Sequence, residues 1–214
     1  MPSTVPIRAV LWDFGGVILS SPFEAFRRYE VEHGLPRDFI RSVNATNPTE
    51  NAWARLERSD ISAAEFDVEF AAESRDLGHQ VRGADVLALL QGDIRPEMVD
   101  LLDRVKAAGY LVACLTNNVT TSDAAHPSDR AAALSEVMAR FDAVVESSKV
   151  GVRKPEVQFY EIACGLLDVT PHECVFLDDL GINLKPAAAL GMRTIKVLSA
   201  AQAIADLTAL LPLD

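Results

Sequence analysis

The sequence is poor in cysteine, and this shortage narrows the kinds of site it can form. Three cysteines occur in 214 residues, at Cys114, Cys164 and Cys174, without a CxxC pair or a histidine at zinc-ligand spacing. Cys114 and Cys174 stand inside apolar runs, where a cysteine usually serves as a small core residue. The pattern therefore indicates a reducing compartment, and it argues against a disulfide framework or a zinc site.

Concentrated positive charge and long apolar runs are also lacking. Against 31 acidic residues there are 20 basic ones, which gives a net charge of -11, and no block of lysine and arginine offers a surface for nucleic acid or anionic lipid. The first residues lack the features of a signal peptide, and no apolar run approaches the roughly 20 residues that span a bilayer. We expect a cytoplasmic protein without nucleic-acid or membrane partners. The sequence leaves monomer and homodimer open.

Five short apolar runs, partly β-branched, predict buried parallel strands at 7–13, 110–116, 141–147, 174–179 and 192–198. Helical patterns separate the later strands, at 95–108, 155–166 and 184–190, and a further one closes the sequence at 200–211. Because strands alternate with helices, we expect an α/β protein with a doubly wound, Rossmann-like, five-stranded parallel sheet.

Residues 20–92 contain no strand pattern and interrupt this alternation. The segments SPFE (21–24) and SAAE (62–65) each match a helix capping box, and Gly34 and Gly78 are suited to end helices. We expect residues 1–19 and 93–214 to form the α/β core, with 20–92 inserted after the first strand as a helical cap.

The polar residues with the most chemical potential all follow predicted strands. Asp13 ends the first, Thr116 the second, and Asp178 and Asp179 the fourth, while Lys154 follows the third. Taken singly, each has an ordinary explanation as a turn or helix cap. Because the carboxyl ends of parallel strands meet at one edge of the sheet, we expect them to share a site.

Carboxylates that face each other across neighbouring strands favour Mg²⁺, which prefers hard oxygen ligands. The ion and Lys154 would neutralise a phosphoryl group enough for Asp13 to attack it. The product is an aspartyl-phosphate, which divides one difficult step into two. We expect the metal and the lysine to hold Asp13 as an anion and to lower its pKa.

Further groups would hold the phosphoryl oxygens. We expect Thr116 and the backbone amide of Asn117 to bind them, while Gly15 and Gly16 let the backbone approach metal and substrate closely. Gly16 and Lys154 are accordingly candidate substrate-binding residues as well.

These segments resemble the motifs of the haloacid dehalogenase-like hydrolases. WDFGGVI is similar to the first motif, LTNN to the second, VGVRKPEVQFY to the third and FLDDLGINLKPAAALG to the fourth. The four occur in order across the expected core, and residues 20–92 match the position of the family's helical cap. The stretch from ESSKVGVRKPE to LKPAAALGM looks especially similar to the N-terminal phosphatase domain of soluble epoxide hydrolases. The resemblance implies that Lys154 orients the reactants and balances charge.

The same resemblance implies a metal site. Asp13 would be both nucleophile and metal ligand, Gly15 would supply a backbone carbonyl, and Asp179 would be the second acidic ligand. Asp178 precedes it as a supporting residue. Asn183 takes the place of a polar group that often holds a metal-bound water.

One departure from the family affects the chemistry. Its phosphatases usually carry DxD, where the second aspartate protonates the leaving oxygen and later activates water, but here that position is Gly15. Such an acid–base group contributes roughly 10²- to 10⁴-fold. His126 or a cap carboxylate such as Glu24 could substitute, water could act instead, or the substrate could carry a good leaving group.

Three functions are consistent with these residues. The first is Mg²⁺-dependent hydrolysis of a small phosphorylated metabolite through an aspartyl-phosphate, and the retained hard-cation ligands favour it. The second is 2-haloacid dehalogenation, in which Asp13 displaces halide and neither metal nor leaving-group acid is needed. The third is a pseudo-phosphatase that binds a phosphorylated ligand without turnover.

Overall fold

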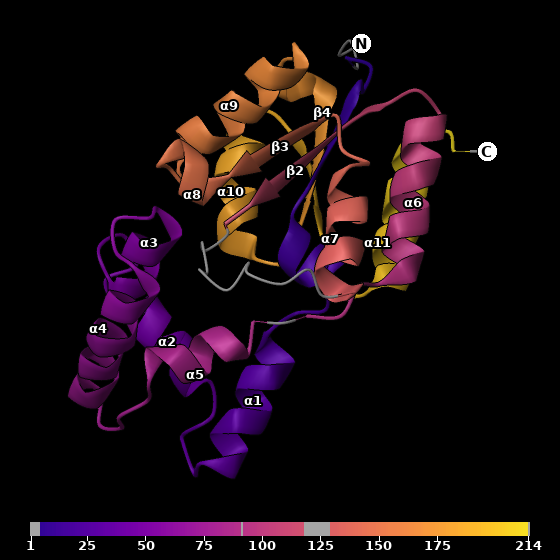
Figure 1. The fold of residues 1–214 in the computed structure, drawn as a ribbon. Coiled ribbons are helices and arrows are strands. Elements are labelled where there is room, and N and C mark those ends of the chain that lie inside the picture. Colours follow the sequence, from indigo (N-terminus) through magenta and orange to yellow (C-terminus); the bar gives the residue numbers. More distant parts are fainter. Residues whose placement is uncertain (1–4, 91, 118–128, 214) are drawn as a thin grey trace.

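The computed structural model describes residues 5–90, 92–117 and 129–213 and contains one parallel five-stranded sheet (Figure 1). The strand order is β3-β2-β1-β4-β5, and Ala9 of β1 pairs with Leu111 of β2 on one side and Cys174 of β4 on the other. This confirms the expected fold class and all five strands. Their bounds are β1 Ala9–Trp12, β2 Leu111–Thr116, β3 Ala143–Glu146, β4 Cys174–Asp178 and β5 Arg193–Lys196.

Both faces of the sheet are covered by helices. Side chains alternate along β1, so Val10 and Trp12 face α6, α7 and α11, whereas Ala9 and Leu11 face α9 and α10. In α10 the first helical residue is Gly181, three positions before the expected start, and α7 and α8 have no counterpart among the expected helices. The helices of this part are α6 Pro96–Ala107, α7 Asp129–Met138, α8 Ser147–Val150, α9 Val157–Leu167, α10 Gly181–Ala189 and α11 Ala200–Leu210, with a short turn, η2, at Pro171–Glu173.

Five helices between β1 and α6 pack around an apolar cluster of their own, which includes Phe26, Ile40, Leu56, Phe66 and Phe70. Figure 1 shows these helices as a group beside the sheet and its covering helices. We call α1–α5 the cap, and its boundaries at 20 and 92 stay a proposal. The bounds are α1 Phe23–Glu32, α2 Phe39–Ala45, α3 Ala52–Glu57, α4 Ala63–Asp76 and α5 Gly83–Ala88. Within the described residues, no helix of the chain has the length and apolar character needed to cross a bilayer.

The two segments that join cap and core run side by side. Leu19 and Ile94 form an antiparallel bridge, and the amide of Ser20 donates to the carbonyl of Asp93 at 2.8 Å. The chain therefore leaves and re-enters the core at neighbouring points.

Of the two expected capping boxes, one is confirmed and the other is wrong. At α4 the amide of Glu65 donates to Ser62 Oγ at 3.2 Å, and the Glu65 carboxylate accepts from the Ser62 amide. At α1 the N-cap residue is Pro22 and no described side chain caps the helix, while the Ser21 hydroxyl donates to Asp179 Oδ2 at 3.3 Å. Ser21 therefore does not cap α1 and lies beside Asp179, one of the strand-end carboxylates.

Candidate active site

Three carboxylates meet where the sheet reverses its strand order, between β1 and β4. Asp13 directly follows β1, and its amide donates to the carbonyl of Leu177 at 2.8 Å. Asp178 ends β4 and Asp179 follows it. Asp13, Asp178 and Asp179 each offer an oxygen within 4.8 Å of the others. Open parallel sheets bind ligands at this kind of position.

Lys154 lies between two of these carboxylates. Its Nζ is 2.7 Å from Asp13 Oδ1 and 2.9 Å from Asp178 Oδ2, and its side chain is only 1% exposed. With three carboxylates and one ammonium, the cluster has a formal charge of minus two. A divalent cation would balance that charge, and its ligands would lie at most about 4 Å apart, close to the observed spacing. The residues present therefore fit Mg²⁺.

Asp178 is held by a dense set of donors. Leu180 donates its amide to Oδ1 at 2.8 Å, and the Asn183 side-chain amide reaches both carboxylate oxygens at 3.1 and 3.0 Å. Tyr160 in turn donates its hydroxyl to the Asn183 carbonyl at 2.7 Å. Asn183 therefore orients Asp178 directly, and its role toward a metal-bound water stays a prediction.

The irregular turn η1 (Phe14–Ile18) contains two glycines, and its geometry requires glycine at position 16 but not at position 15. Gly16 has φ +77°, and a Cβ there would lie 2.3 Å from Asp179 Oδ2. Gly15 has φ -72° and ψ 130°, which any residue can adopt, and a Cβ there would meet no atom of the described residues within 4 Å. The fold therefore does not require glycine at position 15, and an acidic side chain there would be compatible with the backbone.

Thr116 ends β2 and Asn117 follows it, at the same edge of the sheet. Thr116 is buried and stands opposite Glu146 of β3. The Asn117 side chain accepts from the Lys154 amide at 2.9 Å and donates to the Lys154 carbonyl at 3.0 Å. It therefore braces the lysine backbone, while phosphoryl binding by its own amide stays a prediction. His126 lies outside the described residues.

The pKa values of Asp13 and Asp179 differ from those of aspartates in water. Burial raises the pKa of Asp13 to about 8; Lys154 opposes this shift and Asp178 adds to it. In the metal-free chain the cost of burying one more negative charge outweighs the attraction of one lysine, and the expected lowering of this pKa by a bound metal ion together with Lys154 stays a prediction. Burial, with Asp178, also raises the pKa of Asp179 to about 6. At Lys154, burial works against the charge, yet Asp13 and Asp178 outweigh it and raise the pKa.

These shifts predict an unusual pH dependence of stability. The folded chain keeps protons on Asp13 and Asp179 that the unfolded chain releases near pH 4, so metal-free stability should fall as pH rises through about 6 and 8. The slope can reach about 1.4 kcal/mol per pH unit for each retained proton. Melting temperatures in EDTA should decline from pH 5 to 8.5, and Mg²⁺ should raise them more at pH 8 than at pH 6. A decline of equal size in Asp13→Asn would contradict this assignment.

Four residues near the site were not anticipated from sequence: Ser21, Tyr160, Glu57 and Arg153. Glu57 ends α3 of the cap, is 5% exposed, and lies 2.5 Å from the Arg153 guanidinium. Arg153 had a local signal, since it directly precedes Lys154. Glu57 had none, because its partners are distant in sequence.

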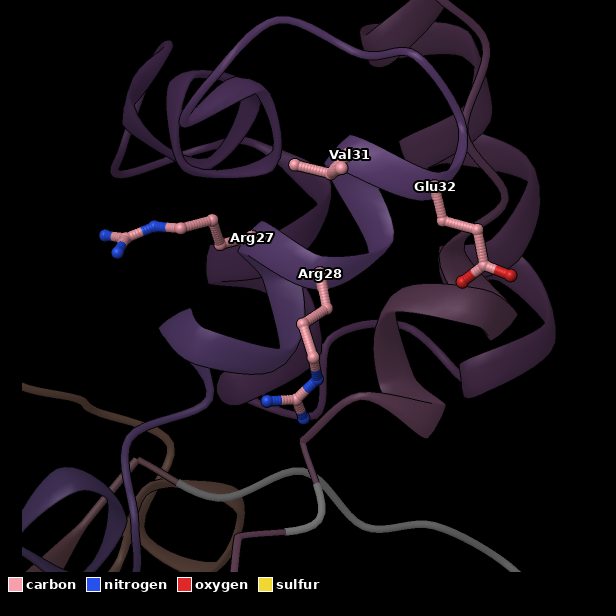
Figure 2. Close-up of a pocket in the computed structure, with 4 residues that line it drawn as sticks. All are labelled: Arg27, Arg28, Val31 and Glu32. Atoms are coloured by element: carbon pink, nitrogen blue, oxygen red, sulfur yellow. The ribbon is translucent and has the colours of Figure 1, made fainter.

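A surface hollow on the cap is separate from this cluster. Figure 2 shows it on α1, lined by Arg27, Arg28, Val31 and Glu32. None of the strand-end residues lines it, and we assign it no role.

Most of the chain matches a known protein family. Residues 7–191 match the family model described as haloacid dehalogenase-like hydrolase. The chain belongs to this family. The expected family resemblance is thereby confirmed. The relatives of this chain include both phosphatases and dehalogenases.

Several curated proteins are similar to this hydrolase. It is 32% identical to mouse Acyl-CoA dehydrogenase family member 10 over 95% of the chain, and 32% identical to mouse Bifunctional epoxide hydrolase 2 over 94%. It spans only 19% and 38% of the length of those two relatives. It is also 29% identical to (S)-2-haloacid dehalogenase 1 of a Pseudomonas strain, over 90% of this chain and 85% of that one.

Solved structures share the fold at lower identity. A crystal structure of a dehalogenase matches with a TM-score of 0.66 and 21% identity over the whole of both chains. An enzyme of the same family from Bacteroides thetaiotaomicron, in complex with magnesium and inorganic phosphate, matches with a TM-score of 0.55 and 21% identity, covering 89% of this chain and 93% of that one.

Proposed function

We propose that this hydrolase is a Mg²⁺-dependent phosphomonoesterase that acts on a small phosphorylated metabolite. The observation that carries the proposal is the cluster of buried Asp13, buried Asp178 and half-buried Asp179 around Lys154, whose excess negative charge suits a divalent cation. A displacement of halide would need only the nucleophile, so the additional carboxylates favour phosphoryl chemistry. The magnesium and phosphate in the Bacteroides relative support the same ligand pair.

Asp13, Asp179 and the carbonyl of Gly15 would hold the ion, with Asp178 beside them. Bound Mg²⁺ would neutralise charge on the phosphoryl oxygens. Asp13 Oδ1 accepts hydrogen bonds from the Phe14 amide and from Lys154, both at 2.7 Å. We therefore assign the attack on phosphorus to Asp13 Oδ2, which receives no hydrogen bond from any described residue.

The reaction would proceed in two displacements. Asp13 Oδ2 forms a bond to phosphorus while the bond to the leaving oxygen breaks, and the leaving oxygen takes a proton from water. A second water then attacks phosphorus and gives a proton to the hydroxide left by the first step, which frees inorganic phosphate and restores the Asp13 carboxylate. Lys154, the Thr116 hydroxyl and the Asn117 amide would hold the phosphoryl oxygens in both steps.

The missing acid at position 15 predicts a strong dependence on the leaving group. Without a side chain to protonate the leaving oxygen, acyl and aryl phosphates should react about 10² times faster than alkyl phosphates or more. A panel of phosphorylated metabolites and p-nitrophenyl phosphate, assayed with Mg²⁺ and with EDTA, measures this. Equal rates across the panel would show that another acid acts, and activity that persists in EDTA would contradict the metal role.

A second candidate is 2-haloacid dehalogenation, which Gly15 and the Pseudomonas relative favour. Asp13 would displace halide from carbon to form an ester that water then hydrolyses. Chloride release from 2-chloropropionate in EDTA would support it over the phosphatase. Mg²⁺-dependent phosphate binding without turnover of either substrate class would instead indicate a ligand-binding protein.

A further inference from the structure

We propose that Glu57 is a positioning residue through which the cap holds the active-site lysine in place. The inference rests on the proposed function, because it assigns the cap control over the residues that would meet a phosphoryl group. Its physical basis is a chain of contacts that starts on α3 of the cap and ends at Asp13.

The first link is an ion pair between cap and core. The Glu57 carboxylate lies 2.5 Å from an Arg153 guanidinium nitrogen, and the two side chains are 6% and 15% exposed. Arg153 also donates to the carbonyl of Pro48 at 3.0 Å, in the segment just before α3. Nearby, the Ser59 hydroxyl donates to the Ser148 carbonyl at 3.3 Å. One guanidinium thus contacts the cap at two places from the residue that precedes Lys154.

The second link leads to the lysine. Asn117 Nδ2 donates to Glu57 Oε2 at 3.5 Å, and the same side chain makes both hydrogen bonds to the Lys154 backbone. Glu57 therefore contacts Arg153, directly before the lysine, and Asn117, which braces it. Lys154 Nζ in turn lies 2.7 Å from Asp13 Oδ1.

The energetics of the buried ion pair between Glu57 and Arg153 are compatible with a contact that forms when the cap closes on the core and breaks when it opens. Burial raises its pKa, while Arg153 and a hydrogen bond from Trp53 oppose this shift. Separating the cap from the core would return both charged groups to water, which offsets much of the lost attraction. Removing only one partner leaves the other buried without its countercharge, and that closed arrangement is disfavoured. The intact pair therefore permits closure, and a single truncation should hinder it.

A double-mutant cycle on Glu57→Gln and Arg153→Gln tests this link. We expect each single variant to lower kcat/KM for p-nitrophenyl phosphate by about tenfold or more, equivalent to roughly 1.4 kcal/mol. KM should rise together with a fall in kcat, since both closure and lysine placement suffer. The double variant should be no worse than either single one, because neither charge is then left alone.

Hydrogen exchange supplies a readout that does not depend on turnover. In the single variants the Lys154 amide, which donates to Asn117, should exchange at least about tenfold faster, and peptides of α3 should follow. Glu69→Gln is the matched control, because it breaks the 2.7 Å pair with Arg55 that stays inside the cap. It should leave exchange at Lys154 unchanged.

The outcomes separate this inference from the proposed function. Absent turnover in the unmutated chain and in every variant, combined with faster exchange in the single variants, would contradict the phosphatase proposal and retain the Glu57 link. Additive losses in the double variant, or unchanged exchange at Lys154, would overturn the link itself.

Discussion

Hydrolysis of p-nitrophenyl phosphate by Asp13→Asn should fall by about 10⁴-fold or more, because the variant lacks the oxygen nucleophile that forms the aspartyl-phosphate. An asparagine of nearly the same shape can still accept from the Phe14 amide and from Lys154, as Asp13 Oδ1 does at 2.7 Å. The loss should therefore appear in kcat with the fold intact. Steady-state kinetics and circular dichroism measure the two properties.

Asp100→Asn offers a control for the loss of one acidic group. Asp100 is an exposed residue of α6, outside the carboxylate cluster, and its variant should keep full activity. Substantial turnover by Asp13→Asn would end the covalent mechanism and leave the cluster as a binding site.

Gly15→Asp should produce the largest gain of activity. A Cβ at this position would meet no atom of the described residues within 4 Å, and the backbone conformation suits any residue. The added carboxylic acid could protonate the leaving oxygen and later activate water, which is worth roughly 10²- to 10⁴-fold. The gain should be greatest for alkyl phosphates, whose leaving groups most need a proton. Rates across the phosphate panel should therefore become more uniform.

Gly15→Ala separates acid catalysis from a change in backbone freedom. It adds a Cβ at the same place without a titratable group, so it should leave the leaving-group dependence as it is. If Gly15→Asp gives no more than Gly15→Ala on alkyl phosphates, then some other group already supplies the proton.

The sheet and the gathering of its strand-end residues could be predicted from sequence. Strand-length apolar runs stop at Asp13, Thr116 and Asp178, and parallel strands bring such residues to one edge. These are local signals combined with one general rule of topology. Lys154 follows the same logic, because it stands shortly after β3.

The rest depended on contacts between segments that are remote in sequence. The pattern SPFE predicted a helix cap, yet the Ser21 hydroxyl donates to the carboxylate of Asp179, which is distant in sequence. Glu57 looked like an ordinary polar residue of a short helix. Its charged partner, Arg153, lies just after α8, which packs against α3, and only the folded structure brings the two together. The raised pKa of Asp13 likewise depends on how deeply Asp13 is buried and on the nearby charge of Asp178, which no spacing in the sequence reveals.

The bridge between Leu19 and Ile94 has an evolutionary consequence. Since the two ends of the cap lie side by side, the cap is an insertion that leaves the core and returns to it at one place. Its length therefore does not alter the distance between the two core segments that it joins. A different set of helices, or a short loop, can occupy the same insertion point while the nucleophile and its neighbours stay in register. Selectivity for the organic part of a substrate can thus diverge within this architecture without the bond-breaking machinery having to be rebuilt.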